Sequence, residues 1–460
     1  MSSIPASPIA TAQTHPITAL PSPPADPALG HLPDFMRDPL GFLQRASTYG
    51  DWVPLQLGDM PACLVSDPAA IEAILKDRSH FIKAQDLKML QGLIGNGLVV
   101  SEGSFWQRQR RLVQPMFHHQ RIADYGQIMV DFTRKHLADW QVGDRRNFHD
   151  EMMRLTLDIV MKTIFDRELS DDTAHRITEA FEVSLAWFEA QYMANLGGSP
   201  CDPALDRRYG QAIALLDESI DAMIQNRRSS SVSQDEPGND LLSLLMAVED
   251  ADDGSRMSDR QLRDETATLI LAGHETTANT LTFAALLLAQ HPAARAALTA
   301  ELQTVLAGRA PTVADLPHLR YTTMVIQEAL RLYPPATDVT REAIADCEIL
   351  GHVIPAGCTL IMSQWVMHHH DRYFDRPEAF EPERWENDLE KRLPRGVYFP
   401  FGDGPRICIG KSFAQMEAVL ILATIAQTVQ WELLSDQPIQ LQPSLTLRPM
   451  GGLPVQLAPL

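Results

Sequence analysis

Cysteine is scarce in this sequence, and its distribution excludes several kinds of site. Only five cysteines occur in 460 residues, an odd number spread widely along the chain: Cys63, Cys201, Cys347, Cys358 and Cys408. Neither the paired Cys-x-x-Cys spacing of zinc sites nor a Cys-x-x-Cys-His motif occurs. Unpaired cysteines of this kind are typical of a reducing compartment, so we expect a cytoplasmic protein.

Positive charge is also in short supply. The 39 lysines and arginines are outnumbered by 59 aspartates and glutamates, which gives a formal net charge of −20 at pH 7. This balance argues against binding to nucleic acid or to an anionic membrane surface. We therefore expect partners that are neutral, apolar or locally complementary in charge.

Long apolar runs are missing from the N-terminus. Residues 1–28 are rich in proline, serine, alanine and threonine and lack both a basic start and an unbroken apolar stretch, so no signal peptide or membrane anchor is predicted. We predict a disordered, proline-rich lead-in over residues 1–32. Residues 33–460 are predicted to form one domain, for which a hydrophobic fraction of 45% provides an ample core.

The most informative stretch is a glycine-rich loop around one of the cysteines. Residues 401–410 read Phe-Gly-Asp-Gly-Pro-Arg-Ile-Cys-Ile-Gly and lead directly into an apolar-periodic helix. The glycines allow the backbone to approach a flat group closely. The amides at the start of the helix and a nearby cation are expected to lower the pKa of Cys408, which describes a thiolate held ready as a ligand. Taken alone, these residues also suit a buried cysteine in a glycine-rich turn.

One helix is predicted to cross the whole molecule. Ser258 and Gln261 form a capping box, and no proline follows until Pro292, so the helix can be about 48 Å long. Its apolar run over residues 269–288 would suit a membrane span but for the polar residues in its middle: His274, Glu275, Thr276, Thr277 and Asn279. We interpret it as a buried helix that carries a polar site. The same residues also fit a kinked helix in which the glutamate is hydrogen-bonded within the protein and has no functional role.

Two further pairs of side chains lie on single helical faces. Trp106 and Arg110 carry only hydrogen-bond donors, which suits a carboxylate held in a dry place, although this spacing also occurs in surface cation–π contacts. Glu328 and Arg331 put opposite charges on one face of a helix that ends at a Tyr-Pro-Pro sequence. An isolated pair of this second kind is common on surfaces and contributes little.

Strands are expected to be a minor part of the structure. Residues 52–57 and 61–65 flank Gly58 and Asp59 and predict a β-hairpin. A terminal β-hairpin is predicted around residues 450–452. The three histidines at 368–370 are interpreted as structural, because adjacent residues cannot converge on one metal ion.

Five of these segments, in their order along the chain, resemble signatures of the cytochrome P450 family. The loop matches the family's haem-ligand signature Phe-x-x-Gly-x-Arg-x-Cys-x-Gly at every fixed position. The others are Trp-x-x-x-Arg at 106–110, Ala-Gly-x-Glu-Thr at 272–276, Glu-x-x-Arg at 328–331 and Pro-Glu-Arg at 382–384. Trp385 stands where the family more often has phenylalanine. The resemblance covers the chain from about Pro33 and implies the cytochrome P450 fold, a multi-helical haem domain that is mainly α with small β-sheets.

The resemblance also implies how haem b would be held. Cys408 would be the axial ligand of the iron, in a loop where Phe401 shields the sulfur and Gly410 precedes the helix. The haem propionates would be bound by four donor residues, namely Trp106, Arg110, Arg341 and Arg406. By the same resemblance, His369 is a further candidate for contact with a haem propionate.

Other residues are assigned by the same likeness. Glu275 and Thr276 would handle protons during oxygen activation. Glu328, Arg331 and Arg384 would form a buried ion network. The substrate pocket is expected from apolar positions in variable loops, namely Leu87, Leu90, Ala272, Ala336, Val339 and Met450.

The implied function is that of a haem-thiolate monooxygenase, because a thiolate ligand favours cleavage of the O–O bond. Such an enzyme inserts one oxygen atom from O2 into a C–H or C=C bond of a lipophilic molecule such as a fatty acid or a terpenoid. Two alternatives keep Cys408 as ligand: a peroxide-driven peroxygenase and a non-enzymatic haem sensor. The intact pair Glu275 and Thr276 favours the oxygen-dependent enzyme over the peroxygenase.

The source of electrons is expected to be a separate protein. The sequence has no Rossmann or Walker pattern, and the roughly thirty residues after the cysteine helix leave no room for a flavin or nicotinamide module. A ferredoxin-type partner is therefore predicted. Lys411 and the arginines near the loop are candidate contacts for it, and they suit equally well a role as solvated charges.

Overall fold

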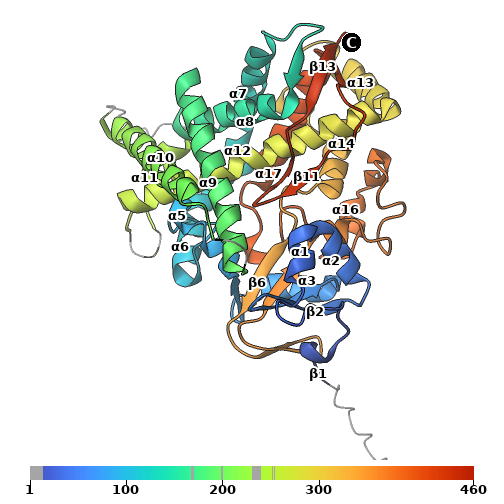
Figure 1. Cartoon of the computed structure of the whole chain (residues 1–460). Helices are drawn as coiled ribbons and strands as arrows, with labels where there is room; N and C mark the ends of the chain where they lie inside the picture. The colour runs from blue at the N-terminus through green and yellow to red at the C-terminus, as the bar shows by residue number, and fades with distance from the viewer. Residues whose placement is uncertain (1–13, 167–169, 198–199, 230–239, 251, 253) are drawn as a thin grey trace, which may run out of the picture.

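The longest helix, α12 (Asp259–Gln290), crosses the centre of the molecule with other helices around it (Figure 1). The structure is a computed structural model that describes residues 14–166, 170–197, 200–229, 240–250, 252 and 254–460. Ser258 Oγ accepts from the Gln261 N–H, and Gln261 Oε1 accepts from the Ser258 N–H, so the predicted capping box and helix are confirmed. No helix of the described residues is long and apolar enough to cross a membrane.

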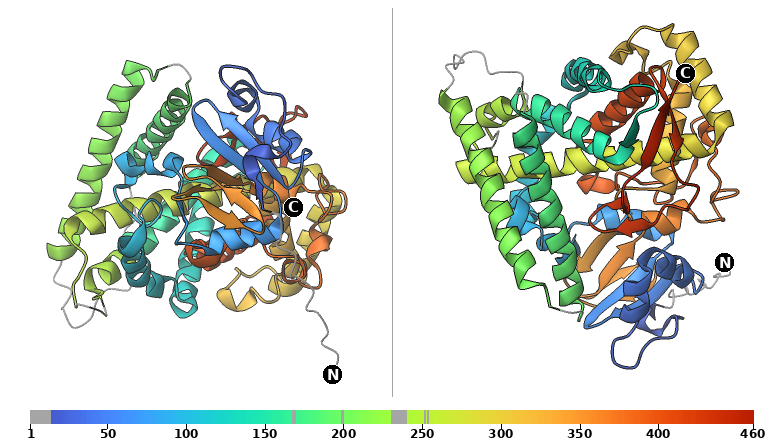
Figure 2. Two further views of the ribbon diagram at one scale, coloured as in Figure 1. Left: turned by 90° about the horizontal axis from the view of Figure 1, so that it is seen from below. Right: turned by 45° about the horizontal axis from the view of Figure 1, so that its top comes forward.

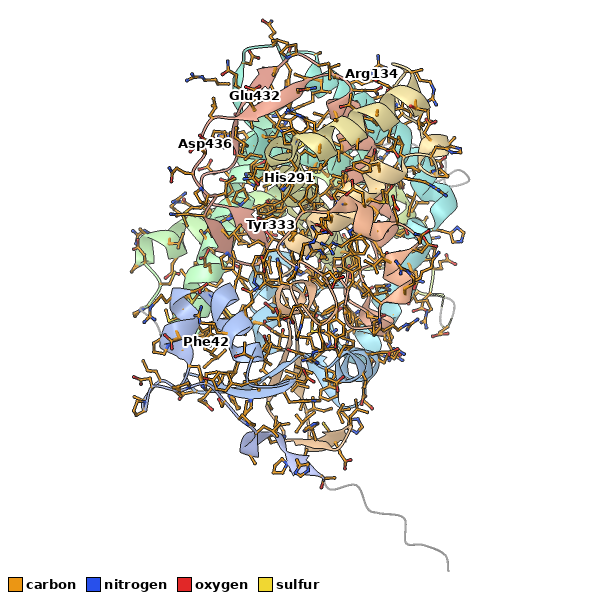
Figure 3. All side chains as sticks on the ribbon, turned by 90° about the vertical axis from the view of Figure 1, so that its right-hand side faces the viewer. Phe42, Arg134, His291, Tyr333, Glu432 and Asp436 are labelled. Atoms are coloured by element: carbon orange, nitrogen blue, oxygen red, sulfur yellow. The ribbon has the colours of Figure 1, made fainter. Side chains whose placement is uncertain are left out.

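The core forms where three helices pack against α12: α8 (Phe148–Phe165), α14 (Arg320–Leu332) and α17 (Lys411–Ala426). Polar residues of α12 are buried along with apolar ones, and four of its threonines bond to the carbonyl four residues earlier: Thr268, Thr276, Thr280 and Thr282. Side chains fill the interior beside α12, where Tyr333 stacks on Phe283 with ring centroids 4.4 Å apart (Figure 3).

A five-stranded sheet in the order β2–β3–β9–β6–β4 lies at one end of the molecule. Its strands are β2 (Trp52–Leu57), β3 (Met60–Val65), β4 (Phe81–Lys83), β6 (Val339–Ala343) and β9 (Thr359–Met362). The predicted hairpin of β2 and β3 is confirmed. In the antiparallel pair of β4 and β6, Lys83 lies opposite Arg341, so both side chains project from the same face.

The predicted disordered lead-in is wrong from His15 onward. Strand β1 (His15–Pro16) pairs in parallel with β8 (His352–Ile354), which also pairs with β7 (Cys347–Ile349). Ile17 is only 1% exposed, because it packs into the apolar cluster beside the five-stranded sheet. Residues well before the predicted boundary at residue 33 therefore belong to the folded domain. Residues 1–13 of the lead-in lie outside the described residues.

The predicted terminal hairpin around residues 450–452 is also wrong. The hairpin there is formed by β11 (Leu441–Pro443) and β12 (Leu447–Pro449), and it turns earlier, around Ser444 to Thr446. Gly451 (φ 77°) and Gly452 (φ 76°) lead the chain away to a second sheet. There β13 (Pro454–Ala458) pairs with both β10 (Gln430–Leu433) and β5 (Arg145–Asn147).

Helices α9 (Asp171–Asn195) and α10 (Pro203–Ser229) lie side by side at the periphery (Figure 2). The remaining helices are α1 (Leu32–Arg37), α2 (Pro39–Ser47), α3 (Pro68–Lys76), α4 (Gln85–Lys88), α5 (Gln91–Ile94), α6 (Gly103–Val113), α7 (His119–Leu137), α11 (Leu241–Ala247), α13 (Pro292–Leu306), α15 (Gln364–His368) and α16 (Leu389–Arg392). The prediction of a mainly helical fold with small sheets is confirmed.

Candidate functional site

A cavity of about 380 Å³ separates α12 from the glycine-rich loop. Cys408 and Phe401 lie on the loop side, and Ala272 and Thr276 lie on the α12 side. The cysteine is the exposed one among the five, because its side chain opens onto this cavity. The sequence thus brings a thiol and the polar centre of the long helix to opposite walls of one space.

The loop that carries the thiol is fixed by backbone contacts. The Cys408 N–H donates to the Phe401 carbonyl at 2.9 Å, which closes the loop before α17 begins. Gly404 has φ 71°, and a Cβ atom there would lie 2.4 Å from the Leu75 carbonyl oxygen of α3. Only glycine fits this position, so the close packing of loop on helix explains one fixed glycine of the motif.

The charge state of the thiol differs from the sequence-based expectation. The side chain is exposed to the cavity, but the protein that surrounds the cavity shields the sulfur from bulk water, and this desolvation raises the pKa of Cys408 above the ordinary value of a thiol. The Gly410 N–H, Arg110 and Lys411 lower it, as the sequence led us to expect, but they do not outweigh the burial. A positive group bound beside the sulfur would lower this pKa and favour the thiolate.

One edge of the cavity is lined by cations and an indole. Arg110 donates to the Ile407 carbonyl at 2.7 Å, Arg341 donates to the Thr340 carbonyl at 2.8 Å, and Arg406 pairs with Glu102. The Trp106 ring lies 5.6 Å from the Arg406 guanidinium. The four predicted donor residues are thus brought together from α6, β6 and the loop.

Lys83 belongs to the same edge and was missed by the sequence analysis. Its ammonium donates to the Leu98 and Ser101 carbonyls, both at 2.9 Å, and lies 5.9 Å from the Trp106 ring centroid. Burial lowers the pKa of Lys83 to about 7, although Glu102 acts in the opposite direction. The sequence does show a lysine in a short apolar segment, which is unusual. Only the strand register, which places Lys83 opposite Arg341, shows that this lysine belongs to the site.

The polar residues of α12 divide between the cavity and the protein interior. Thr276 lines the cavity, and its hydroxyl donates to the Ala272 carbonyl at 2.8 Å. Glu275 does not line the cavity, and its Oε1 accepts from the Thr446 hydroxyl at 2.6 Å. Burial raises the pKa of Glu275. The two predicted proton-handling residues are therefore neighbours that face different surroundings.

A protein-family model described as cytochrome P450 matches residues 20–454. The chain belongs to the cytochrome P450 family. The cyclooctat-9-en-7-ol 5-monooxygenase of Streptomyces melanosporofaciens is 36% identical over 408 residues, with 88% of each chain covered. The pentalenene oxygenase of Streptomyces avermitilis is 32% identical over 439 residues, with 95% of each chain covered.

A solved structure shows the same fold. The crystal structure of the cytochrome P450DA heme domain matches with a TM-score of 0.86 at 27% identity, covering 97% of this chain and 98% of that chain. The predicted family and fold are therefore confirmed. This P450 is an oxidoreductase of the monooxygenase class, like the relatives it resembles.

The residues around the cavity of this P450 fit a haem group. The Nε atoms of Arg341 and Arg406 are buried and have no hydrogen-bond partner among the described residues. Unpaired guanidinium donors in the interior are costly unless an anion meets them. Two haem carboxylates at this edge would supply that anion, and the iron would supply the positive partner of Cys408.

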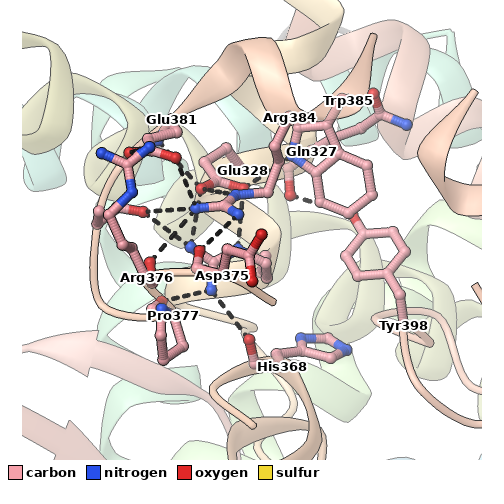
Figure 4. A network of polar contacts seen from close by, with 12 residues as sticks. Gln327, Glu328, His368, Asp375, Arg376, Pro377, Glu381, Arg384, Trp385 and Tyr398 are labelled. Atoms are coloured by element: carbon pink, nitrogen blue, oxygen red, sulfur yellow. Dashed lines mark hydrogen bonds and ion pairs between the residues drawn. The ribbon is translucent and has the colours of Figure 1, made fainter. Parts of the chain in front are cut away.

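In the predicted ion network Glu328 and Arg331 are fully buried, and Arg384 is half-buried (Figure 4). Both Glu328 oxygens accept from Arg331, at 2.9 and 2.8 Å, and Oε1 also accepts from Arg384 Nε at 2.9 Å. The unusual Trp385 donates its indole N–H to Glu328 Oε2 at 2.8 Å. Arg331 also donates to three backbone carbonyls, those of His368, Pro377 and Ala379.

The predicted pocket residues separate into two groups. Leu87, Ala272, Ala336 and Val339 line the cavity. Leu90 and Met450 do not line it, so these two predictions are corrected: Leu90 is buried in the main core, and Met450 is 54% exposed because the chain turns away there toward β13.

The prediction that His369 contacts a propionate is also corrected. Its Nδ1 is 2.8 Å from the Trp365 carbonyl, its ring lies 4.3 Å from the Trp365 ring, and it does not line the cavity. Burial lowers the pKa of His369 to about 4. Its neighbour His368 accepts from the Phe399 N–H at 3.1 Å, so both histidines hold the chain beside the ion network.

A second buried carboxyl lies close to the cavity and was missed by the sequence analysis. Glu417, on α17, is 0% exposed, and burial raises its pKa to about 8. The Thr277 hydroxyl on α12 acts in the opposite direction. A glutamate in the apolar stretch that follows Cys408 was the signal available in the sequence.

Proposed function

We propose that this P450 binds haem b and oxygenates a terpenoid, with Cys408 as the axial ligand and Phe401 and Gly410 beside it. When bound, a thiolate-ligated haem cleaves O2 and delivers one oxygen atom to a C–H or C=C bond. Trp106, Arg110, Arg341, Arg406 and Lys83 would hold its carboxylates. The observation that carries the proposal is one cavity in which the thiol faces α12, while one edge is lined by cations of which Arg341 and Arg406 each keep a buried Nε without a partner among the described residues.

A neutral hydrocarbon substrate is supported by the lining of the cavity. Apart from the polar residues already described, its wall is largely aliphatic, including Leu87, Leu98, Val99, Val160, Leu241, Leu269 and Val339. In the described part of the chain, every cation that lines the cavity lies at the edge assigned to the haem carboxylates. A fatty acid would need one of these cations for its own carboxylate, whereas a terpenoid would not. The relatives named for pentalenene and cyclooctat-9-en-7-ol agree with this choice.

Proton handling is assigned to Thr276 and Glu275. The Thr276 hydroxyl lines the cavity and already bonds to the Ala272 carbonyl, so its oxygen is free to accept from a water or a reacting group. Glu275 adjoins it in a buried place, and burial raises the pKa of its carboxyl, which favours the protonated form that can donate. These two residues would position and pass protons rather than attack the substrate.

We also propose that electrons come from a ferredoxin-type protein and that the enzyme works in the cytoplasm. Beside the glycine-rich loop, Lys391, Arg395 and Lys411 line a groove of mixed charge. Its carboxylates are Glu301, Glu386, Asp388, Glu390 and Asp403. Lys391 and Arg395 are largely exposed. Lys391 is paired with Asp388 and Lys411 with Glu390, so an acidic partner would have to compete with these carboxylates for the same cations.

The proposed ligation is tested by the carbon monoxide difference spectrum of the dithionite-reduced protein, compared with that of Cys408→His. A strongly red-shifted Soret band that is lost in the variant supports thiolate ligation. A band at the ordinary histidine-haem position in the wild type, or a failure to bind haem, would overturn the proposal.

The proposed substrate class is tested by the low-spin to high-spin shift of the ferric Soret band. We expect pentalenene or another terpene hydrocarbon to produce the shift and palmitate to produce none. Val339→Phe, which narrows the cavity, should weaken the shift. A shift with palmitate alone would favour the fatty-acid reading instead.

A further inference from the structure

The carboxyl of Glu275 is held by a residue from a distant part of the chain. Thr446 lies at the turn between β11 and β12, and its hydroxyl donates to Glu275 Oε1 at 2.6 Å. The turn is itself fixed, because the Leu447 N–H donates to the Pro335 carbonyl at 2.8 Å. Both Glu275 and Thr446 are buried, at 4% and 7% exposed. The carboxyl therefore has a fixed partner on one oxygen.

Two more side chains continue this contact toward the surface. Asn279 Nδ2 on α12 donates to Thr446 Oγ1 at 3.1 Å. Asn279 Oδ1 lies 3.0 Å from His149 Nε2 on α8. An amide oxygen can only accept, so His149 must carry its proton on Nε2. The donors therefore all point in one direction, from His149 through Asn279 and Thr446 to Glu275.

This direction decides which oxygen of Glu275 can hold a proton. Oε1 accepts from Thr446, whose own oxygen accepts from Asn279, so a proton on the carboxyl belongs on Oε2. Oε2 is buried and has no hydrogen-bond partner among the described residues. It is thus the atom open to a water molecule or to proton exchange.

We propose that Thr446, Asn279 and His149 are positioning residues that orient Glu275 and confine its exchangeable proton to Oε2. The proposal rests on the proton-handling role given to Glu275 in the proposed function. It adds that the role depends on the β11–β12 turn, which lies 171 residues further along the chain. The side-chain amide of Asn279 does not readily relay protons. This series of hydrogen bonds therefore orients the Glu275 carboxyl and does not carry protons to it.

Charged groups from three other elements face the same carboxyl. Burial raises the pKa of Glu275, whereas the Thr446 hydrogen bond, Arg448 of β12 and His149 of α8 lower it, and Glu182 of α9 raises it. Removing the Thr446 hydroxyl takes away a contact that favours the ionised form, so the carboxyl should stay protonated to higher pH. Removing His149 should act in the same direction and more weakly, because its ring contacts Glu275 only through Asn279.

The test is infrared spectroscopy of the Glu275 carboxyl, identified as the protonated-carboxyl band that is lost in Glu275→Gln. In Thr446→Val the band should move to higher frequency, because its C=O loses a hydrogen bond, and it should persist to higher pH. Thr446→Ser restores the hydroxyl and should restore both properties. Thr282→Val is the matched control: Thr282 is a buried threonine of the same helix whose hydroxyl bonds only to the Ala278 carbonyl. This control should leave the band unchanged.

A band that keeps its frequency and pH dependence in Thr446→Val would overturn the proposal. If Thr446→Val does not fold, His149→Phe replaces it, because His149 is only half-buried. We then expect the pH dependence of the carboxyl band to shift in the same direction by a smaller amount. The absence of any shift in that variant overturns it equally. The spectra are recorded with and without haem, so a failure of haem binding would refute the proposed function without obscuring this result.

A second readout follows the electrons. With a ferredoxin and its reductase supplying electrons, and pentalenene as probe, electrons are divided between hydrogen peroxide and the sum of product and water. Thr446→Val should raise the ratio of peroxide to that sum roughly tenfold, the effect of losing one buried hydrogen bond. The optimum of coupling should move to higher pH. Thr446→Ser should return both to the wild-type values, and an unchanged ratio and optimum in Thr446→Val would count against the proposal.

Discussion

Two clusters of arginines lie within the interior of this P450, and they differ in how completely their donors are used. In the ion network around Arg331, the guanidinium donates to Glu328 and to three carbonyls, and the carboxyl of Glu328 is met by five donors. At the cavity edge, Arg341 and Arg406 each keep a buried Nε without a partner in the described chain. A satisfied cluster stabilises the fold, whereas an unsatisfied one marks the place of a ligand.

The largest effect is expected from breaking the satisfied cluster. Arg331→Met would leave the Glu328 carboxylate buried at 0% exposure with fewer donors and would free three carbonyls. We expect a loss of about 3–5 kcal/mol in the free energy of unfolding, because an uncompensated buried charge remains. Urea unfolding followed by far-UV circular dichroism measures it. A loss below about 1 kcal/mol would show that the network does not support the fold.

The same substitution in the unsatisfied cluster should weaken haem binding and leave the stability of the haem-free protein unchanged. Arg341→Met removes a cation whose pKa is lowered to about 10 by burial and by the nearby Arg406. The haem-free protein should therefore be no less stable in urea than the wild type. Haem should be lost faster, with an affinity lower by about 2 kcal/mol, or roughly 30-fold. Haem transfer to apomyoglobin gives the rate, and an unchanged rate would remove Arg341 from the haem site.

The protonation of Lys83, a further cation at the cavity edge, provides a pH-dependent test of the difference between the two clusters. In the haem-free protein its pKa is lowered from 10.5 to about 7, so between these values the folded protein holds Lys83 neutral while the unfolded chain protonates it. Stability contributed by this group therefore increases as the pH rises through that window and is lost below about pH 7. Haem carboxylates would raise the pKa again, so binding of haem near pH 8.5 should take up close to one proton.

Calorimetric titration of the haem-free protein with haem, in buffers of different ionisation enthalpy, measures this proton uptake. Lys83→Met should abolish it, and Lys88→Met, at an accessible lysine of α4 that does not line the cavity, should retain it. Equal proton uptake by Lys83→Met and the wild type would assign the titration to another group.

Much of the site could be predicted because its motifs are local in sequence. The loop that holds Cys408 and the polar centre of α12 each lie within ten residues, so residue type and spacing were enough to locate them. Lys83 and Thr446 could not be found in this way. Their importance depends on strand register opposite Arg341 and on a turn that reaches Glu275 from the far end of the chain.

The errors have a related cause. Met450 was assigned to the pocket as an apolar position in a variable loop, and a hairpin was predicted around it. The hairpin turns at Thr446 instead, so the methionine lies outside while the threonine is buried. His369 was assigned from the family resemblance, yet its ring lies against Trp365 and does not line the cavity. In both cases tertiary packing decided which neighbour in the sequence faces the site.

The smallest effect concerns Trp385, the one residue of the ion network that departs from the usual family residue. Trp385→Phe keeps an aromatic ring at this position and removes only the indole hydrogen bond to Glu328. Because the acceptor is a buried carboxylate that retains four other donors, we expect a loss of about 1 kcal/mol in the free energy of unfolding, with haem binding unchanged.

Trp431→Phe is the matched control, since the Trp431 indole is equally buried and donates at 2.9 Å to the neutral Ala285 carbonyl. A bond to a charged acceptor should be the stronger of the two, so Trp385→Phe should cost more than Trp431→Phe in urea unfolding. If Trp385→Phe costs less, the four remaining donors already satisfy Glu328, and the indole fills space in the network without adding to its electrostatic balance. The distinction between satisfied and unsatisfied clusters would then rest on Arg331 and Arg384 alone.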